Sequence, residues 1–149
     1  MVSVVSTEDM LEACQRLFPG CNGMIGVAAP CDYRPIKVAT GKINKTGEPL
    51  QLQLIETPDV VATLGASKQG QWLVGFALET DDHRLRALAK LEKKSCDLMI
   101  LNGPQAMNAL ETQVEIIDPA GSVVEALSGT KERVAQDIFR VIQQRLIRR

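Results

Sequence analysis

Aromatic side chains and histidine are scarce in this chain of 149 residues. Phe, Trp and Tyr together make up 3% of the residues, and His83 is the single histidine. So few rings do not supply the stacking platforms that proteins use to hold single-stranded nucleic acid. The formal net charge of -1 also gives no strong field toward nucleic acid or an anionic membrane surface. Composition therefore excludes nucleic acid as the expected partner.

Long hydrophobic runs are missing as well. The apolar runs are far too short to span a bilayer, and the N-terminus has neither the basic start nor the apolar core of a secretion signal. No two of the four cysteines have Cys-x-x-Cys spacing, so we expect reduced thiols rather than disulfides or a zinc site. These absences favour a cytoplasmic protein without a membrane partner.

What the chain does contain is the composition of an ordinary globular domain, with 45% hydrophobic and 23% charged residues. The length predicts a single domain over residues 1–149, large enough to bury roughly 70% of its unfolded surface. We find no internal repeat, low-complexity segment or interdomain linker.

Strand and helix patterns alternate along the chain, which favours a layered α/β sheet. Helices are expected after Ser6 or Thr7, after Thr57 as N-cap, after Thr80 or Asp81, and over 130–146 with one apolar face. The strand at 24–29 is continuously apolar, so we expect both of its faces to be buried. Strands are predicted at 2–6, 24–29, 50–55, 72–78 and 97–101, with a hairpin formed by 114–117 and 122–127.

A carboxylate and two ammonium groups follow the second of these strands. Asp32 comes just after the apolar run 24–29, where open α/β sheets build their ligand crevices, and it could bind a cation or a hydroxyl. From spacing alone, the commoner role for such a residue is to cap the turn between two prolines. Residues 33–49 predict a basic, mobile surface loop, whose Lys42 and Lys45 could close over a phosphorylated substrate or simply be solvated.

Other polar residues carry weaker signals. His83 has no serine or cysteine partner in a recognisable arrangement, so a catalytic triad is not expected. Glu79 and Asp97 adjoin apolar strands and could face the same crevice, although such carboxylates also cap helices. Cys31 has no basic neighbour in sequence that argues for an activated thiol, and no Walker-type or Gly-x-Gly-x-x-Gly phosphate loop is present.

Six short motifs, in order along nearly the whole chain, carry a resemblance to a known family. Together they resemble phosphopantothenate-cysteine ligase, the ligase half of a bifunctional bacterial coenzyme A biosynthesis flavoprotein whose other half is an FMN-dependent decarboxylase. The motifs are Ala28-Ala29-x-x-Asp32-Tyr33-Arg34-Pro35, Lys42-Ile43-x-Lys45, Thr57-Pro58-Asp59, Gly75-Phe76-Ala77-x-Glu79-Thr80, Lys90-Leu91-x-x-Lys94-x-x-Asp97 and Asn102.

The resemblance implies a Rossmann-like three-layer α/β sandwich with a mostly parallel sheet, a basic flap loop and a C-terminal β-hairpin plus helix. It implies a homodimer in which a nucleoside triphosphate, CTP in most bacteria and otherwise ATP, activates the carboxylate of 4'-phosphopantothenate as an acyl-nucleotide, with Mg²⁺ accompanying the triphosphate. Cysteine then displaces the nucleotide to form an amide. By position, Lys42 and Lys45 would be catalytic, and the nucleotide pocket would be lined by Ala28, Ala29 and Asp32 with Asp59 and Phe76 as neighbours.

The chain also departs from the family pattern. Asn44 stands where bacterial members have a further lysine, Pro30-Cys31 replaces a small apolar pair, and Gln113 replaces an asparagine. The family's first Rossmann strand and its glycine-rich turn have no counterpart here. We therefore expect an N-terminally incomplete ligase domain, inactive by itself, with FMN relevant only if a decarboxylase is fused upstream. The alternative is a non-catalytic truncated homologue that serves as a nucleotide-binding or dimerisation subunit.

Overall fold

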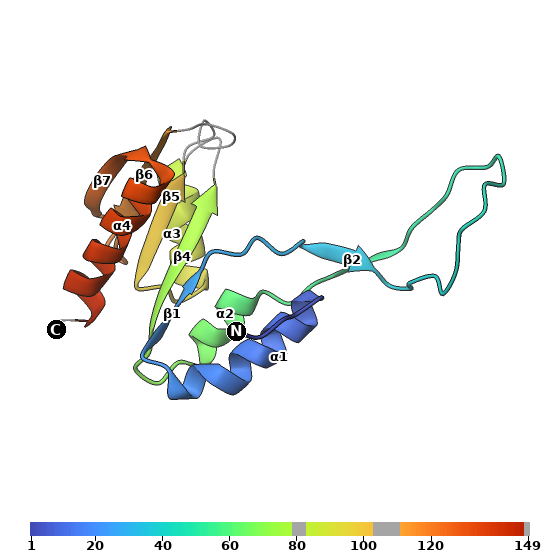
Figure 1. Ribbon diagram of the computed structural model, residues 1–149, viewed down its shortest axis with the longest axis horizontal. Coiled ribbons are helices and arrows are strands. Elements are labelled where there is room, and N and C mark those ends of the chain that lie inside the picture. The colour runs from blue at the N-terminus through green and yellow to red at the C-terminus, as the bar shows by residue number, and fades with distance from the viewer. Residues whose placement is uncertain (79–82, 103–110, 148–149) are drawn as a thin grey trace.

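The protein is built on a five-stranded sheet with the strand order β1-β4-β5-β6-β7 (Figure 1). The computed structural model describes residues 1–78, 83–102 and 111–147. Pairing is parallel from β1 to β4 and from β4 to β5, and antiparallel on both sides of β6, so β6 alone runs against the other four strands. The strands are β1 (Gly23–Gly26), β4 (Trp72–Leu78), β5 (Leu98–Asn102), β6 (Glu111–Ile117) and β7 (Val123–Thr130).

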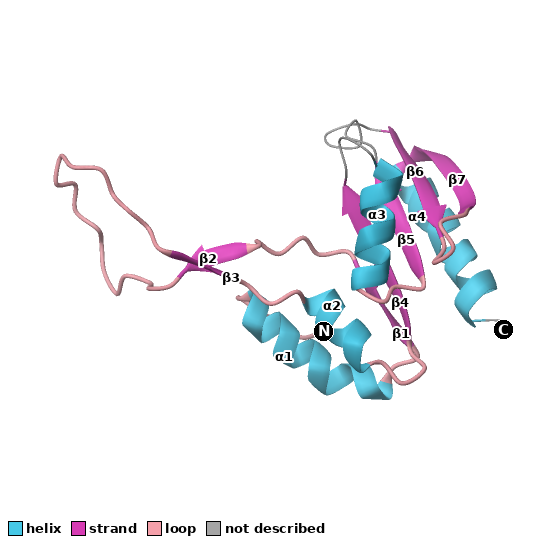
Figure 2. Cartoon of the chain, turned by 180° about the vertical axis from the view of Figure 1, so that it is seen from behind, coloured by secondary structure: helices cyan, strands magenta, loops and turns pink. Residues whose placement is uncertain are grey.

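Side chains alternate across this sheet and form one apolar cluster on each face. On β4, Leu73 and Ala77 belong to one cluster, whereas Val74 belongs to the other. The first face is covered by α1 (Thr7–Leu17), α2 (Val60–Ser67) and α3 (His83–Lys93), and the second by α4 (Lys131–Ile142). Figures 1 and 2 show the helices on the two sides of the sheet. The predicted three-layer Rossmann-like fold, with four of five strands codirectional, is confirmed.

The first helix begins as predicted at Ser6, but the strand predicted at 2–6 is wrong. The Ser6 hydroxyl accepts a hydrogen bond from the Asp9 N–H at 3.0 Å, and the Asp9 carboxylate accepts from the N–H groups of Val5 and Ser6 at 3.2 and 3.0 Å. This capping box occupies backbone donors that a strand would give to its neighbour. The local sequence therefore supports a helix start rather than a sixth strand.

The second helix begins two residues later than predicted. Asp59, not Thr57, is the N-cap of α2, and its carboxylate accepts a hydrogen bond from the Ala62 N–H at 3.0 Å. Thr57 instead donates its hydroxyl to the carbonyl of Cys31. Thr57 is thus tied to a segment 26 residues away in sequence, a contact that local spacing could not indicate.

The strand predicted at 24–29 is shorter and less buried than expected. β1 ends at Gly26, all four of its residues are half-buried, and in the described part of the chain it pairs with β4 alone. An edge position explains this result, because an edge strand lacks the second neighbour that buries a central strand. The two partners lie close together, since a Cβ built on Gly23 would overlap the Trp72 ring at 2.0 Å.

The C-terminal prediction is confirmed. β6 and β7 form an antiparallel hairpin, and Thr130 caps α4 by accepting the Arg133 N–H at 3.3 Å. A short π-helical turn, Gln143–Ile147, follows α4. No helix within 1–78, 83–102 or 111–147 has the length and apolar character needed to cross a membrane. The buried side chains of α4 are the predicted Val134, Ile138, Val141 and Ile142.

One segment leaves the layered body. β2 (Tyr33–Pro35) and β3 (Leu54–Glu56) pair antiparallel, and the chain between them, 36–53, extends outward in Figures 1 and 2. We call residues 33–56 the arm. A strand with one solvent-exposed face and one buried face was predicted at 50–55. Instead, every residue of β2 and β3 is exposed, because no helix or further strand covers them among the described residues.

Candidate functional site

The carboxyl ends of the parallel strands meet at one edge of the sheet. Gly26, the last residue of β1, pairs with Gly75 of β4, so Phe76 lies beside the point where the chain leaves the sheet toward Ala28 and Ala29. Open α/β sheets bind ligands at this edge. The structure therefore brings three of the predicted site residues to the same edge, with Phe76 half-buried on the α4 side and both alanines exposed.

Asp32 lies farther from the sheet than predicted. β1 ends at Gly26, and an exposed connection carries the chain six residues further to Asp32, at the start of the arm. There the Asp32 carbonyl accepts a hydrogen bond from the Thr57 N–H at 2.9 Å, while the residue itself is exposed. Asp32 is therefore held by its backbone, and its carboxylate is open to solvent or a ligand.

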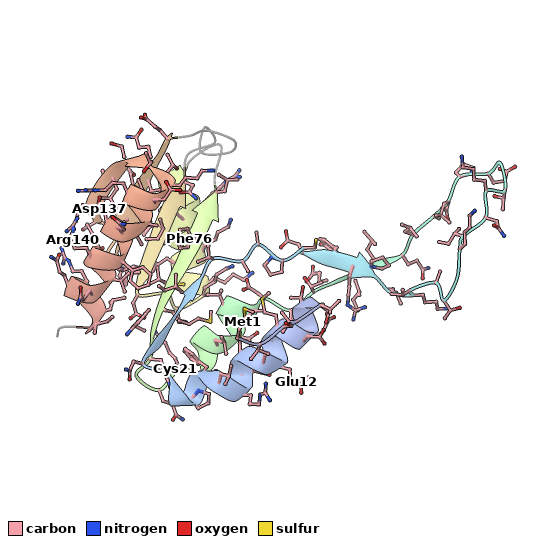
Figure 3. All side chains as sticks on the ribbon, viewed as in Figure 1. Met1, Glu12, Cys21, Phe76, Asp137 and Arg140 are labelled. Atoms are coloured by element: carbon pink, nitrogen blue, oxygen red, sulfur yellow. The ribbon has the colours of Figure 1, made fainter. Side chains whose placement is uncertain are left out.

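Lys42 and Lys45 lie in the outer part of the arm, and both are exposed. Lys42 is the tenth residue after Asp32, and ten residues of extended chain can span about 30 Å. Figure 3 shows the side chains of the loop standing clear of the layered body. A single copy of the chain therefore does not bring the two lysines to the carboxyl edge.

Asp59 is separated from Phe76 by the sheet. α2 packs through Val60 into the cluster on the first face, whereas Phe76 contributes to the cluster on the second. The Asp59 carboxylate also pairs with the Lys94 ammonium at 3.1 Å. Partial burial alone would raise the pKa of Asp59, but the Ala62 N–H and Lys94 together hold that pKa below its usual value. These bonds give Asp59 a structural role at the start of α2.

Asp97 does not face the predicted crevice. It precedes β5 at the opposite edge of the sheet, where its carboxylate accepts from the Leu73 N–H and from Lys68, each at 2.8 Å. The expectation for Asp97 is wrong because a residue before a strand lies at the amino edge. Glu79 and Thr80 lie outside the described residues, as does the side chain of His83.

A cavity of about 570 Å³ opens at this amino edge. It contains none of the predicted site residues, and sequence reasoning did not anticipate it. Because ligand crevices of open α/β sheets form at the carboxyl ends of the strands, we place the candidate site there and not in this cavity. The cavity is lined by Cys21, Asn22, Gln69, Gly70, Gln71, Trp72, Leu146 and Ile147.

The part of the chain that the structure describes holds no group of three or more His, Cys, Asp or Glu side chains that could bind a metal ion. Mg²⁺ commonly binds through one or two carboxylates and the phosphates of a nucleotide, so a single exposed carboxylate such as Asp32 can still supply one ligand. The residues present therefore fit a metal that arrives with a triphosphate.

The arm carries an apolar surface that sequence reasoning missed. Leu50, Leu52 and Leu54 recur with period two, a pattern that predicts a half-buried strand, yet their exposed fractions are 65%, 60% and 53%. Contiguous exposed apolar surface marks an interaction site, and a lone two-stranded ribbon is marginally stable in water. Further exposed apolar residues of the arm are Tyr33, Ile36, Val38, Ile43 and Ile55.

This chain is similar in sequence to known proteins. Residues 1–146 match the family described as DNA/pantothenate metabolism flavoprotein C-terminal domain. A cysteine/cysteine sulfinic acid decarboxylase from an unknown prokaryotic organism is 37% identical over 147 residues, covering 95% of this chain and 41% of that protein. The coenzyme A biosynthesis bifunctional protein CoaBC of Haemophilus influenzae is 31% identical over 147 residues, covering 96% and 37%.

Among solved structures, the crystal structure of the C-terminal domain of a CoaBC protein superposes with a TM-score of 0.76 at 31% identity. The match covers 96% of this chain and 66% of that domain. The chain thus spans about two fifths of the length of the curated relatives.

Proposed function

Because the chain belongs to the DNA/pantothenate metabolism flavoprotein C-terminal domain family, we propose that it acts in coenzyme A biosynthesis as part of a phosphopantothenate-cysteine ligase. The observation that carries the proposal is the family match over residues 1–146. The edge that gathers Ala28, Ala29 and Phe76 supports it, as do the lysines on the arm.

The proposed reaction has two steps. A carboxylate oxygen of 4'-phosphopantothenate attacks the α-phosphorus of CTP or ATP, and pyrophosphate leaves. The amine of cysteine then attacks the acyl carbon, the nucleoside monophosphate leaves, and an amide forms. Negative charge develops on the phosphates in the first step, so Lys42 and Lys45 would stabilise its transition state. Mg²⁺ would accompany the triphosphate, with Asp32 as one available carboxylate. FMN would be needed only by a decarboxylase domain preceding this one.

In this proposal the lysines act on the site of a second copy of the chain. The outer arm carries Lys42 and Lys45, while Glu56 lies at its start and Asp32 directly precedes it. If two arms pair antiparallel, the two lysines of each come near Asp32 and Glu56 of the other, and the exposed apolar side chains are buried between them. A homodimer would thus place the lysines of one subunit near Asp32 of the other.

The activity is tested by pyrophosphate release in the presence of 4'-phosphopantothenate, cysteine and Mg²⁺ with either CTP or ATP. We expect no release by the 149-residue chain alone, and release once it is joined to the part of the Haemophilus influenzae CoaBC C-terminal domain that its match does not cover. Calorimetric titration with CTP and ATP measures nucleotide binding separately. A joined protein that binds nucleotide but never releases pyrophosphate would overturn the ligase assignment and favour a non-catalytic nucleotide-binding subunit.

Replacing Lys42 by Gln in the joined protein tests the role of the arm. We expect turnover to fall by about 100-fold or more, because a positioned cation at a developing charge is worth several kcal/mol. The thermal midpoint should not change, since Lys42 is exposed. Lys37→Gln in the same arm is the matched control. Equal loss of turnover in both variants would contradict a specific role for Lys42.

A further inference from the structure

We propose that Glu8, Arg34 and Thr57 are positioning residues that set the direction of the arm. This inference rests on the proposed function, in which the arm delivers Lys42 and Lys45 to a second subunit. Arg34 lies at the start of the arm, Thr57 directly follows it, and Glu8 lies in α1 beside it.

Two sets of contacts tie the arm to the body. Arg34, on β2, pairs through its Nε with a carboxylate oxygen of Glu8, in the first turn of α1. Thr57, just after β3, donates its N–H to the Asp32 carbonyl at 2.9 Å and its hydroxyl to the Cys31 carbonyl. Arg34 thus ties β2 to α1, whereas the Thr57 bonds close the base of the arm two residues before the N-cap of α2.

Both anchors are themselves fixed to the body. α1 contributes Met10, Leu11 and Cys14 to the apolar cluster of the first face. Thr57 leads through Pro58 to the N-cap Asp59, which is paired with Lys94. The arm is therefore tied to α1 through the Arg34–Glu8 pair, and its second strand leads directly into α2, as Figure 2 shows from behind.

The strands of the arm hold each other but do not fix its direction. Tyr33 pairs with Glu56 in the register, its hydroxyl bonds the Glu56 carboxylate at 3.3 Å, and the Ile36 N–H donates to the Gln53 carbonyl at 3.0 Å. These bonds lie within the arm. Rotation of the arm as a whole would leave these bonds intact, so the Arg34–Glu8 pair is the contact that opposes rotation, while the Thr57 bonds to residues 31 and 32 fix the base from which the arm starts.

The direction of the arm matters because the arm is long. If the arm reaches about 30 Å, a rotation of about 10° at its start moves the tip by roughly 5 Å. A displacement of about 1 Å is already enough to cost a large part of a catalytic rate. Weak contacts at the start can therefore have a large effect at the lysines.

The contacts are electrostatically consistent with this role. The hydrogen bond from Arg34 holds the pKa of Glu8 below its usual value, so the pair is charged at neutral pH. Exposed pairs are weak, and removing this one alone should change the population of the correct arm direction only about two- to five-fold. Thr57→Val also removes a side-chain donor, and we expect an effect of up to about ten-fold.

Hydrogen exchange on the 149-residue chain tests the inference without reference to catalysis. We expect Glu8→Gln and Thr57→Val to raise exchange at segments 31–36 and 53–57. Glu12→Gln is the matched control, because Glu12 is an exposed glutamate one turn further along α1 (Figure 3). Unchanged exchange in both test variants would overturn the inference, whatever the activity of the protein.

Kinetics of the joined protein provide the second measurement. We expect Glu8→Gln and Thr57→Val to lower kcat, while the KM for cysteine and the thermal midpoint stay as in Glu12→Gln. Exchanging the charges in Glu8→Arg with Arg34→Glu, and replacing Thr57 by Ser, should restore kcat at least in part. High salt should reduce the effect of Glu8→Gln, because it screens the pair. Failure of both rescues would show a merely structural role, and complete inactivity of the joined protein would count against the ligase assignment alone.

Discussion

The four thiols of this chain differ in burial, with Cys14 half-buried. Cys21 and Cys31 are exposed, whereas Cys96 is buried and its burial raises its pKa to about 11. The thiolate is the reactive form, so at pH 8 we expect iodoacetamide to modify Cys96 at least about 100-fold more slowly than the exposed pair. Peptide mass spectrometry after timed alkylation measures this ratio. Comparable rates in the native state would show that the core around Cys96 opens readily.

Asp59 should make stability dependent on pH on the acid side. Its pKa is lowered in the folded protein, so its contribution is fully present above the ordinary aspartate pKa of about 3.9 and is lost as the pH falls through the lower folded value. Asparagine caps helices nearly as well but cannot pair with Lys94. In urea unfolding, Asp59→Asn should therefore be less stable than the original chain at pH 7, and this difference should shrink progressively as the pH falls below about 3.9. A difference that does not change with pH would contradict the ion pair.

At the scale of elements, the contact between α2 and the end of α3 depends on a glycine. A Cβ added to Gly65 would lie 2.0 Å from the Lys94 carbonyl oxygen. Alanine favours a helix by about 1 kcal/mol over glycine, but a clash with backbone should outweigh that gain, and we expect Gly65→Ala to cost about 1–3 kcal/mol. Gly20→Ala is the control, since nothing lies within 4 Å of its added Cβ. Urea unfolding compares the two, and a stabilised Gly65→Ala variant would contradict this packing.

The whole molecule consists of a layered body and an arm, and the two should separate by mutation. Ile36 and Gln53 are hydrogen-bonded at 3.0 Å, so residues 37–52 can be replaced by an Asn-Gly turn that closes a short hairpin. We expect the shortened chain to keep its thermal midpoint, because the removed residues are exposed, and to lose self-association in sedimentation velocity. Unchanged self-association would show that copies contact one another through the body instead.

Sequence periodicity predicted the body well where elements are buried by their neighbours. β4 spans the predicted residues 72–78, and the buried face of α4 is the predicted one. Predictions failed where a polar side chain had two possible partners. Thr57 was predicted as an N-cap from local spacing, yet it bonds Cys31, and Asp97 was expected at the crevice although a residue before a strand lies at the other edge.

The amino-acid sequence by itself determined the α/β class, most element positions and, through short motifs, the family, because these depend on residue order and periodicity. Only the tertiary structure decided that β1 is an edge strand, that Asp59 and Phe76 lie on opposite faces of the sheet, and that the lysines stand on an arm away from it. These properties depend on which distant segments meet. Such contacts are a consequence of packing the whole chain, and no local pattern encodes them.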